Sequence, residues 1–193
     1  KRAIEKGQAH GPRIFSAGES LSITAGHGSK KPGKINYDGP YELVEAARTQ
    51  ISAGASWIKI LISGGIATNG GDLAAALMTP EEIHAVIDAA HRFGVKVTAH
   101  SGSPAATSVA IDAGLDCVEH GYFLDQKTLR KMKKHGTWLV PTIVVSQPAS
   151  QPFFERIGSP PWYLKRRNAA GKAHWQALKM AIKVGVNIGL GTD

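Results

Sequence analysis

Short runs rich in β-branched residues alternate along the chain with longer segments whose apolar residues recur at helical spacing. The short runs predict strands at Leu21–Thr24, Trp57–Ser63, Val95–His100, Cys117–His120, Trp138–Pro141 and Val186–Leu190. The longer segments predict helices at Tyr41–Ala53, Pro80–Phe93, Ser103–Gly114, Asp125–Gly136 and Pro161–Val184. Strands that alternate with helices in this way indicate a parallel sheet whose strands are joined by right-handed crossovers.

The start of one helix is marked by the sequence Thr79-Pro80-Glu81-Glu82. Thr79 is a good N-cap residue, and proline is well tolerated at the first helical position. Glu82 stands three residues after Thr79, which is the spacing of a capping box. We therefore expect a sharply defined helix start at this point.

The number of strands favours part of a TIM barrel over a doubly wound nucleotide-binding sheet. No G-x-G-x-x-G follows a first strand, and the Walker lysine motif is absent from the sequence. Eight barrel units need about 250 residues, so six units correspond to roughly 190, close to the 193 present. We predict an α/β fold, an incomplete (β/α)8 barrel running from the third to the eighth strand, as one domain over residues 1–193.

Four ionisable residues lie at or near the carboxyl ends of predicted strands: Lys59, His100, His120 and Asp193. Each alone has an ordinary structural explanation, such as a hydrogen-bonded core histidine, a lysine that reaches to water or an aspartate that caps a turn. Parallel strands, however, bring their carboxyl ends to one edge, where α/β proteins bind ligands. The shared position of these four residues at strand ends therefore predicts that they form one common site.

Strand alternation supports this convergence for two of the four residues. In Trp57–Ser63, Lys59 shares one face with Trp57 and Leu61, and the opposite face carries only isoleucine. In Val95–His100, the histidine shares its face with a lysine and a threonine. A purely aliphatic face suits packing against helices, so we expect Lys59 and His100 to face the barrel lumen.

Two imidazoles and a carboxylate are suitable ligands for a divalent metal such as zinc. A lysine ammonium is not a ligand, because it has no lone pair. Burial favours the neutral amine, however. A neutral amine can add carbon dioxide to form a carbamate, whose carboxylate-like group can bridge two cations. We expect little water around the Lys59 amine.

The segments IKILISGG, VTAHS, VEHG and GLGTD, with GPRIFSAGESLSITAGHG upstream, resemble the amidohydrolase superfamily. They are most similar to its imidazolonepropionase-like and Xaa-Pro dipeptidase (prolidase-like) branch, and the resemblance covers nearly the whole chain. It implies two zinc ions bridged by a carbamylated Lys59. It also implies that His100 and His120 bind one ion, while Asp193 binds the other and serves as the catalytic proton acceptor.

The resemblance further implies an amide substrate: an N-acyl or Xaa-Pro dipeptide, or a small cyclic amide. It places the loop of His27 over the site, and Tyr122 follows His120 closely, so both are candidate substrate-binding residues. We interpret His84, His91, His135 and His174, which lie in predicted helices or at their ends, as surface or packing residues. The family's H-x-H pair is absent, which we interpret as truncation, and we expect these 193 residues alone to be inactive.

Two other functions stay open at this point. One is a mononuclear cyclic-amide hydrolase or deaminase on the same fold, in which Lys59 is unmodified. The other is a non-catalytic barrel that binds an anion, because the formal net charge is +8. The strand-end residues argue against the second, since an anion site needs neither Asp193 nor paired imidazoles.

Composition limits the kinds of binding partner and the cellular location that we expect for the protein. The 23 basic residues form short clusters, such as Lys30, Lys31 and Lys34, without the interleaved aromatic residues that stack on bases, so we expect no nucleic-acid partner. No apolar run approaches the roughly 18 residues of a membrane span. Cys117 is the single cysteine. We expect a cytoplasmic protein, since no signal peptide is visible, and a homo-oligomer at full length.

Overall fold

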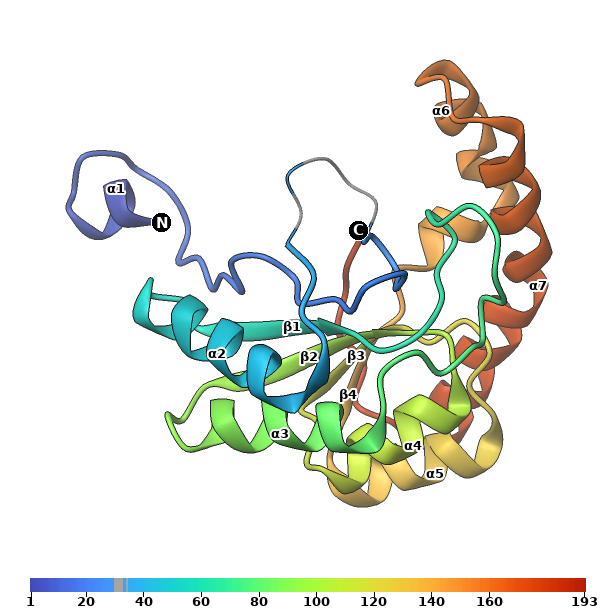
Figure 1. Ribbon diagram of the computed structural model, residues 1–193. Coiled ribbons are helices and arrows are strands. Elements are labelled where there is room, and N and C mark those ends of the chain that lie inside the picture. Colours follow the sequence, from blue (N-terminus) through green and yellow to red (C-terminus); the bar gives the residue numbers. More distant parts are fainter. Residues whose placement is uncertain (30–32, 34) are drawn as a thin grey trace.

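Four parallel strands form the central sheet of the computed structural model, which describes residues 1–29, 33 and 35–193. They are β1 (Trp57–Leu61), β2 (Lys96–Ser101), β3 (Cys117–His120) and β4 (Trp138–Val140), and they pair in chain order (Figure 1). The basic cluster of Lys30, Lys31 and Lys34 lies outside the described residues.

The described residues contain the five predicted helices and two further short helices, one near the N-terminus and one before the last helix, that the sequence pattern does not predict. They are α1 (Arg2–Glu5), α2 (Gly39–Ser52), α3 (Pro80–His91), α4 (Pro104–Asp112), α5 (Gln126–His135), α6 (Gln151–Arg156) and α7 (Pro161–Val184), with short 3-10 turns at Ile143–Ser146 and Pro148–Ser150. The helices α2 to α5 lie along one face of the sheet, and α7 runs beside its far end (Figure 1). The other face carries the loops that meet above the strands.

The two outermost predicted strands are wrong in length. Each is reduced to a single parallel bridge, Leu21 with Ile60 and Leu139 with Ile188. After Leu21 the chain turns away, because the Ser22 hydroxyl donates a hydrogen bond to the His27 carbonyl and so closes a tight loop. The order of the six segments across the sheet is nevertheless the predicted one.

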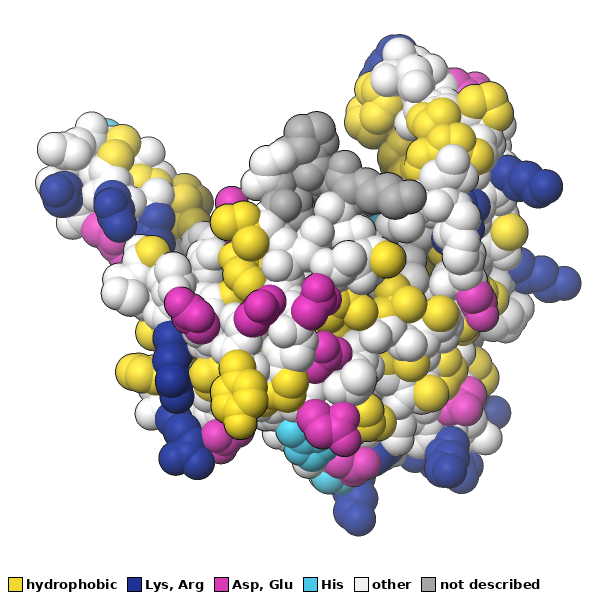
Figure 2. Space-filling model, viewed as in Figure 1, with side chains coloured by type: hydrophobic (Ala, Val, Ile, Leu, Met, Phe, Trp, Pro, Cys, Tyr) yellow, Lys and Arg dark blue, Asp and Glu magenta, His cyan; other side chains and the backbone are white. Residues whose placement is uncertain are grey.

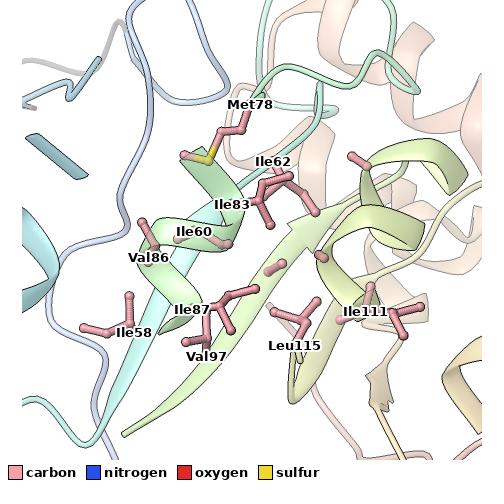
Figure 3. Close-up of a cluster of buried hydrophobic side chains, with 14 of the residues drawn as sticks. Ile58, Ile60, Ile62, Met78, Ile83, Val86, Ile87, Val97, Ile111 and Leu115 are labelled. Carbon is pink, nitrogen blue, oxygen red and sulfur yellow. The ribbon is translucent and has the colours of Figure 1, made fainter. Parts of the chain in front are cut away.

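The aliphatic face of β1 forms the core, as alternation predicts. Ile58, Ile60 and Ile62 are fully buried and pack against Ile83 and Ile87 of α3 (Figure 3). Each such side chain contributes about 1.5–3 kcal/mol when it leaves water. This packing fixes which face of β1 points away from the helices, and therefore where Lys59 points.

The capping box at the start of α3 is confirmed. The Thr79 hydroxyl accepts from the Glu82 amide at 3.3 Å, and the Glu82 carboxylate accepts from the Thr79 amide at 2.8 Å. The second Glu82 oxygen accepts from the Gly39 amide at 2.9 Å, which ties the start of α2 to the same carboxylate. Glu82 therefore holds two helix starts together.

Charged side chains do not gather into one basic surface on the face shown in Figure 2. Lys and Arg lie mainly toward its edges, and Asp and Glu lie nearer its middle. Within the described part of the chain, no helix is long and apolar enough to cross a membrane. Cys117 is a free, buried thiol.

Candidate active site

The structure brings all six residues singled out in the sequence to one cavity. Lys59, His100 and His120 line it from β1, β2 and β3, and Asp193 lines it from the end of the chain. The cavity has a volume of about 200 Å³, and it lies at the carboxyl end of the strands. The remaining two of the six, His27 and Tyr122, lie in its wall.

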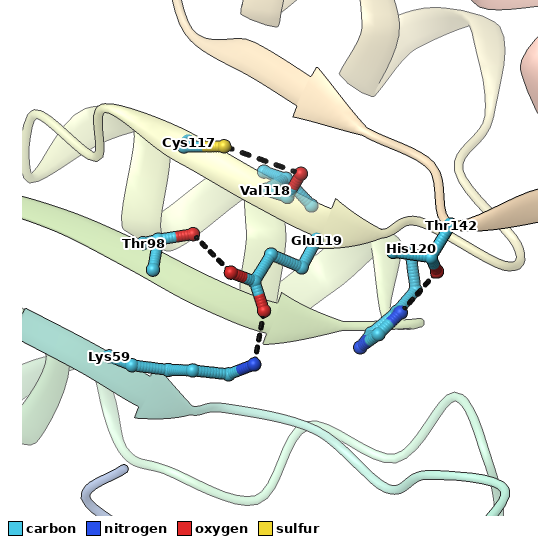
Figure 4. Close-up of polar contacts among 7 residues, drawn as sticks. All are labelled: Lys59, Thr98, Cys117, Val118, Glu119, His120 and Thr142. Atoms are coloured by element: carbon cyan, nitrogen blue, oxygen red, sulfur yellow. Dashed lines mark hydrogen bonds and ion pairs between the residues drawn. The ribbon is translucent and has the colours of Figure 1, made fainter. Parts of the chain in front are cut away.

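Lys59 reaches across β2 to form an ion pair with Glu119 on β3 (Figure 4). The Thr98 hydroxyl on the intervening strand donates to the other Glu119 oxygen at 3.2 Å. The Lys59 side chain is 27% exposed, so the expectation of scarce water around its amine is wrong. The strands among the described residues form one open sheet, so no opposing strand covers this face of β1.

His100 is buried and has a defined orientation. Its Nε2 lies 2.9 Å from the Gly64 carbonyl oxygen, which can only accept, so Nε2 carries the proton. The lone pair of this tautomer is then on Nδ1. Burial, with a smaller contribution from neighbouring His27, lowers the pKa of His100 to about 3. The ring is therefore neutral near pH 7, the form in which imidazole binds metals.

His120 reaches the cavity by a different route. Alternation along β3 puts Glu119 on the lumen face and would turn the next residue toward the helices. The backbone of His120 instead has a φ of 69°, a left-handed conformation that turns the side chain back. Its Nδ1 lies 2.7 Å from the Thr142 hydroxyl, and its ring stacks parallel to Tyr122 at 5.2 Å between centroids. Burial lowers the pKa of His120 well below its usual value.

His27 is packed flat against His100, with 4.2 Å between ring centroids. Its Nδ1 lies 2.6 Å from the Thr68 hydroxyl. A Cβ atom at Gly65 would overlap the His27 ring, so any larger residue there would displace that ring. The loop after β1 and the loop of His27 are thus fitted to each other above His100.

The donor atoms at this cavity are of the types that bind a divalent metal, but they do not make a complete set of ligands. Two neutral imidazoles, a carboxylate and a lysine line the same space, and all but the lysine are ordinary zinc ligands. Among the described residues, however, no three His, Cys, Asp or Glu side chains are grouped closely enough to hold an ion. Further ligands are needed.

The sequence does not predict the contacts that four groups make around the site: Glu119, Thr142, the Gly64 carbonyl and His174. The first three act through hydrogen bonds that cross between strands and loops, which no local pattern reveals. His174 is different, because its burial follows helical spacing with Gly171, Ala177 and Ala181 on α7. It is a packing residue, as expected, but it also contacts His120.

A family model described as the amidohydrolase family matches residues 1–193. The chain belongs to this family. The ochratoxinase of Aspergillus niger is 32% identical over 215 residues, covering all of this chain and 44% of that protein. The amidohydrolase chain thus spans less than half the length of this curated relative.

Solved structures agree with the family assignment. A prolidase complexed with N-methylphosphonate-L-proline superimposes with a TM-score of 0.91 at 31% identity, covering the whole chain and 51% of that protein. A Xaa-Pro dipeptidase with bound methionine gives 0.88 at 32% identity, covering the whole chain and 50% of that one. The prediction of an incomplete amidohydrolase barrel is therefore confirmed.

Proposed function

We propose that the complete protein carrying this chain is a metal-dependent hydrolase of amide bonds. The observation that carries the proposal is the meeting of two buried, neutral imidazoles with Lys59 and Asp193 at the carboxyl ends of parallel strands. The names of its relatives, a prolidase and a Xaa-Pro dipeptidase, support a carbon–nitrogen bond as the target. We propose an N-acyl or Xaa-Pro dipeptide, or a small cyclic amide, as substrate.

In this proposal His100 binds a metal through Nδ1 and His120 through Nε2, because their other ring nitrogens are already hydrogen-bonded. Lys59, as a carbamate, and Asp193 would be the other ligands from this chain. Further ligands come from outside these 193 residues. Two zinc ions held there would lower the pKa of a water and would polarise the scissile carbonyl.

The chain's own residues then move and hold protons. Asp193 accepts the proton of the attacking water and delivers it to the leaving nitrogen. Burial raises the pKa of the Tyr122 phenol, so its hydroxyl stays protonated and can donate to the substrate oxygen. His27, which stacks on His100 in the cavity wall, contacts the substrate beside the scissile bond. In this proposal the ligand of the cavity is a small amide substrate. Assembly of the complete protein into a homo-oligomer and its location in the cytoplasm stay predictions.

One observation favours the mononuclear alternative. Lys59 is paired with Glu119, and a carbamate at Lys59 would place two anions side by side. If Lys59 keeps its ammonium, the same donors serve a single metal in a cyclic-amide hydrolase or deaminase. The two candidates differ in metal content, and the deaminase form of the alternative would in addition release ammonia, which amide hydrolysis of a dipeptide or cyclic amide does not.

The experiment is a hydrolysis assay of the complete protein against Xaa-Pro dipeptides, N-acyl amino acids and small cyclic amides. We expect turnover of at least one class, loss of turnover on chelation and its return with zinc. His100→Ala should abolish zinc-restored activity, whereas His84→Ala, at an exposed position of α3, should not. Full activity of the metal-free protein would contradict the proposal, as would inactivity of the zinc-loaded protein toward all three classes.

A further inference from the structure

His174 is a fully buried histidine on α7 that makes two hydrogen bonds. Its Nε2 lies 3.0 Å from the main-chain carbonyl oxygen of His120, and its Nδ1 lies 2.8 Å from the Ser146 hydroxyl. A carbonyl can only accept, so Nε2 carries the proton and Ser146 donates to Nδ1. The ring is therefore fixed at both nitrogens, with its donor aimed at the end of β3.

The carbonyl that accepts from His174 belongs to a strained turn. His120 has a φ of 69°, and across it the Gly121 amide donates to the Glu119 carbonyl at 3.0 Å. A hydrogen bond between residues i and i+2 around a positive φ is the pattern of a rare, strained γ-turn. Such a conformation persists only where surrounding contacts hold it. This turn is also what aims the His120 imidazole into the cavity.

The same histidine supports the aromatic residue beside His120. The rings of His174 and Tyr122 meet edge to face, with 4.7 Å between centroids. Tyr122 in turn lies parallel to the His120 ring. His174 thus contacts the His120 main chain directly and the His120 side chain through one intervening ring.

We propose that His174 is a positioning residue, which holds the γ-turn at His120 and thereby orients the His120 imidazole toward the metal. This inference rests on the proposed function insofar as it names a metal as the target of His120. The positioning itself is a property of the chain, and it can be measured with or without the metal.

The test compares substitutions at His174 in the complete protein. His174→Phe keeps a buried ring and removes the donor, whereas His174→Gln keeps an amide N–H that can reach the same carbonyl. Ala181→Gly, at a buried position about two turns after His174 on the same helix, is the matched control for a general loss of stability. Zinc affinity is measured by competition with a chromophoric chelator, with kcat and KM measured separately.

We expect His174→Phe to weaken zinc binding by about 10- to 100-fold, the usual cost of losing a group that orients a metal ligand. His174→Gln should restore most of that affinity, and Ala181→Gly should lower the Tm while leaving zinc affinity unchanged. Wild-type zinc affinity in His174→Phe would overturn the proposal, and so would a His174→Gln variant as weak as His174→Phe.

A second measurement separates this proposal from the proposed function. If the wild-type protein binds no zinc, the proposed function fails, and the imidazole ¹H–¹⁵N signals of His120 in the metal-free protein decide the role of His174. The His120 signals should change in His174→Phe and stay near those of the wild type in His174→Gln. Unchanged His120 signals in His174→Phe would overturn the positioning role of His174. If His174→Phe does not fold, Ser146→Ala decides by the same signals, because it frees the ring at Nδ1.

Discussion

His27 owes its place against His100 to the missing side chain of Gly65. Any Cβ at that position would overlap the His27 ring, which is also held by the Thr68 hydroxyl at 2.6 Å. The ring is the end of a side chain and can move without disturbing the core. Substitution at Gly65 should therefore affect the cavity more than the fold.

We predict that Gly65→Ala lowers kcat/KM of the complete protein by about tenfold, corresponding to about 1.4 kcal/mol, with little change in Tm. The same substitution in a His27→Ala background should have almost no further effect, because the displaced ring is already absent. Steady-state kinetics on the four proteins of this cycle measure the coupling. Fully additive losses would show that Gly65 acts independently of His27.

At the residue scale, the sequence predicts some side-chain directions and misses others. Alternation places Lys59 and His100 on the lumen face, because both lie within regular strands. It would turn His120 away, since a left-handed backbone leaves no periodic signal. The partner of Lys59 is likewise invisible, because Glu119 lies two strands away in the sheet and 60 positions away in the chain.

At the element scale, helix starts are the most predictable features, because their signals are local. The capping box at Thr79 forms with both hydrogen bonds present, and α3 begins at Pro80 as expected. Strand lengths at Leu21 and Ile188 are not predictable in this way. Pairing there depends on neighbours distant in sequence, and each segment keeps a single bridge.

We predict that Thr79→Ala lowers the free energy of unfolding by about 1 kcal/mol, through loss of the N-cap hydrogen bond. Thr49→Ala, at an exposed position near the end of α2, is the matched control and should be close to neutral. Urea unfolding of the complete protein measures both, and zinc-dependent kcat should be unchanged in both. An effect of Thr49→Ala as large as that of Thr79→Ala would contradict a capping role.

At the scale of the whole molecule, three buried histidines make stability depend on pH. Burial lowers the pKa values of His100, His120 and His174 in the folded protein below the ordinary value of 6.5. Between the two values the unfolded chain binds more protons, so stability is present above pH 6.5 and is lost as the pH falls. For each imidazole that stays neutral in the folded protein, the free energy of unfolding falls by about 1.4 kcal/mol per pH unit as the pH decreases through that window.

We therefore predict that the metal-free complete protein loses several kcal/mol of unfolding free energy between pH 7 and pH 5. Urea denaturation at half-unit pH steps measures this loss, and His174→Gln should make the slope shallower by the share of one imidazole. A free energy that stays constant between pH 7 and pH 5 would show that these rings are not held neutral in the folded state.

The parallel arrangement of the strands follows from their alternation with helices along the chain. The whole chain superimposes on about half the length of two solved relatives. What the sequence does not yield is the open face of the sheet, which leaves Lys59 partly exposed beside Glu119. Metal analysis of the complete protein and its variants decides whether that lysine bridges two metals.

The measurement is zinc bound per chain after dialysis in the presence of bicarbonate, together with hydrolysis. We expect two zinc ions in the wild-type protein and in Lys96→Ala, a control at an exposed lysine of β2. Lys59→Ala should lose paired binding and activity, both partly restored by a short-chain carboxylic acid, and Lys59→Arg should stay inactive because guanidinium cannot form a carbamate. Two bound zinc ions and full activity in Lys59→Arg would contradict the carbamate bridge.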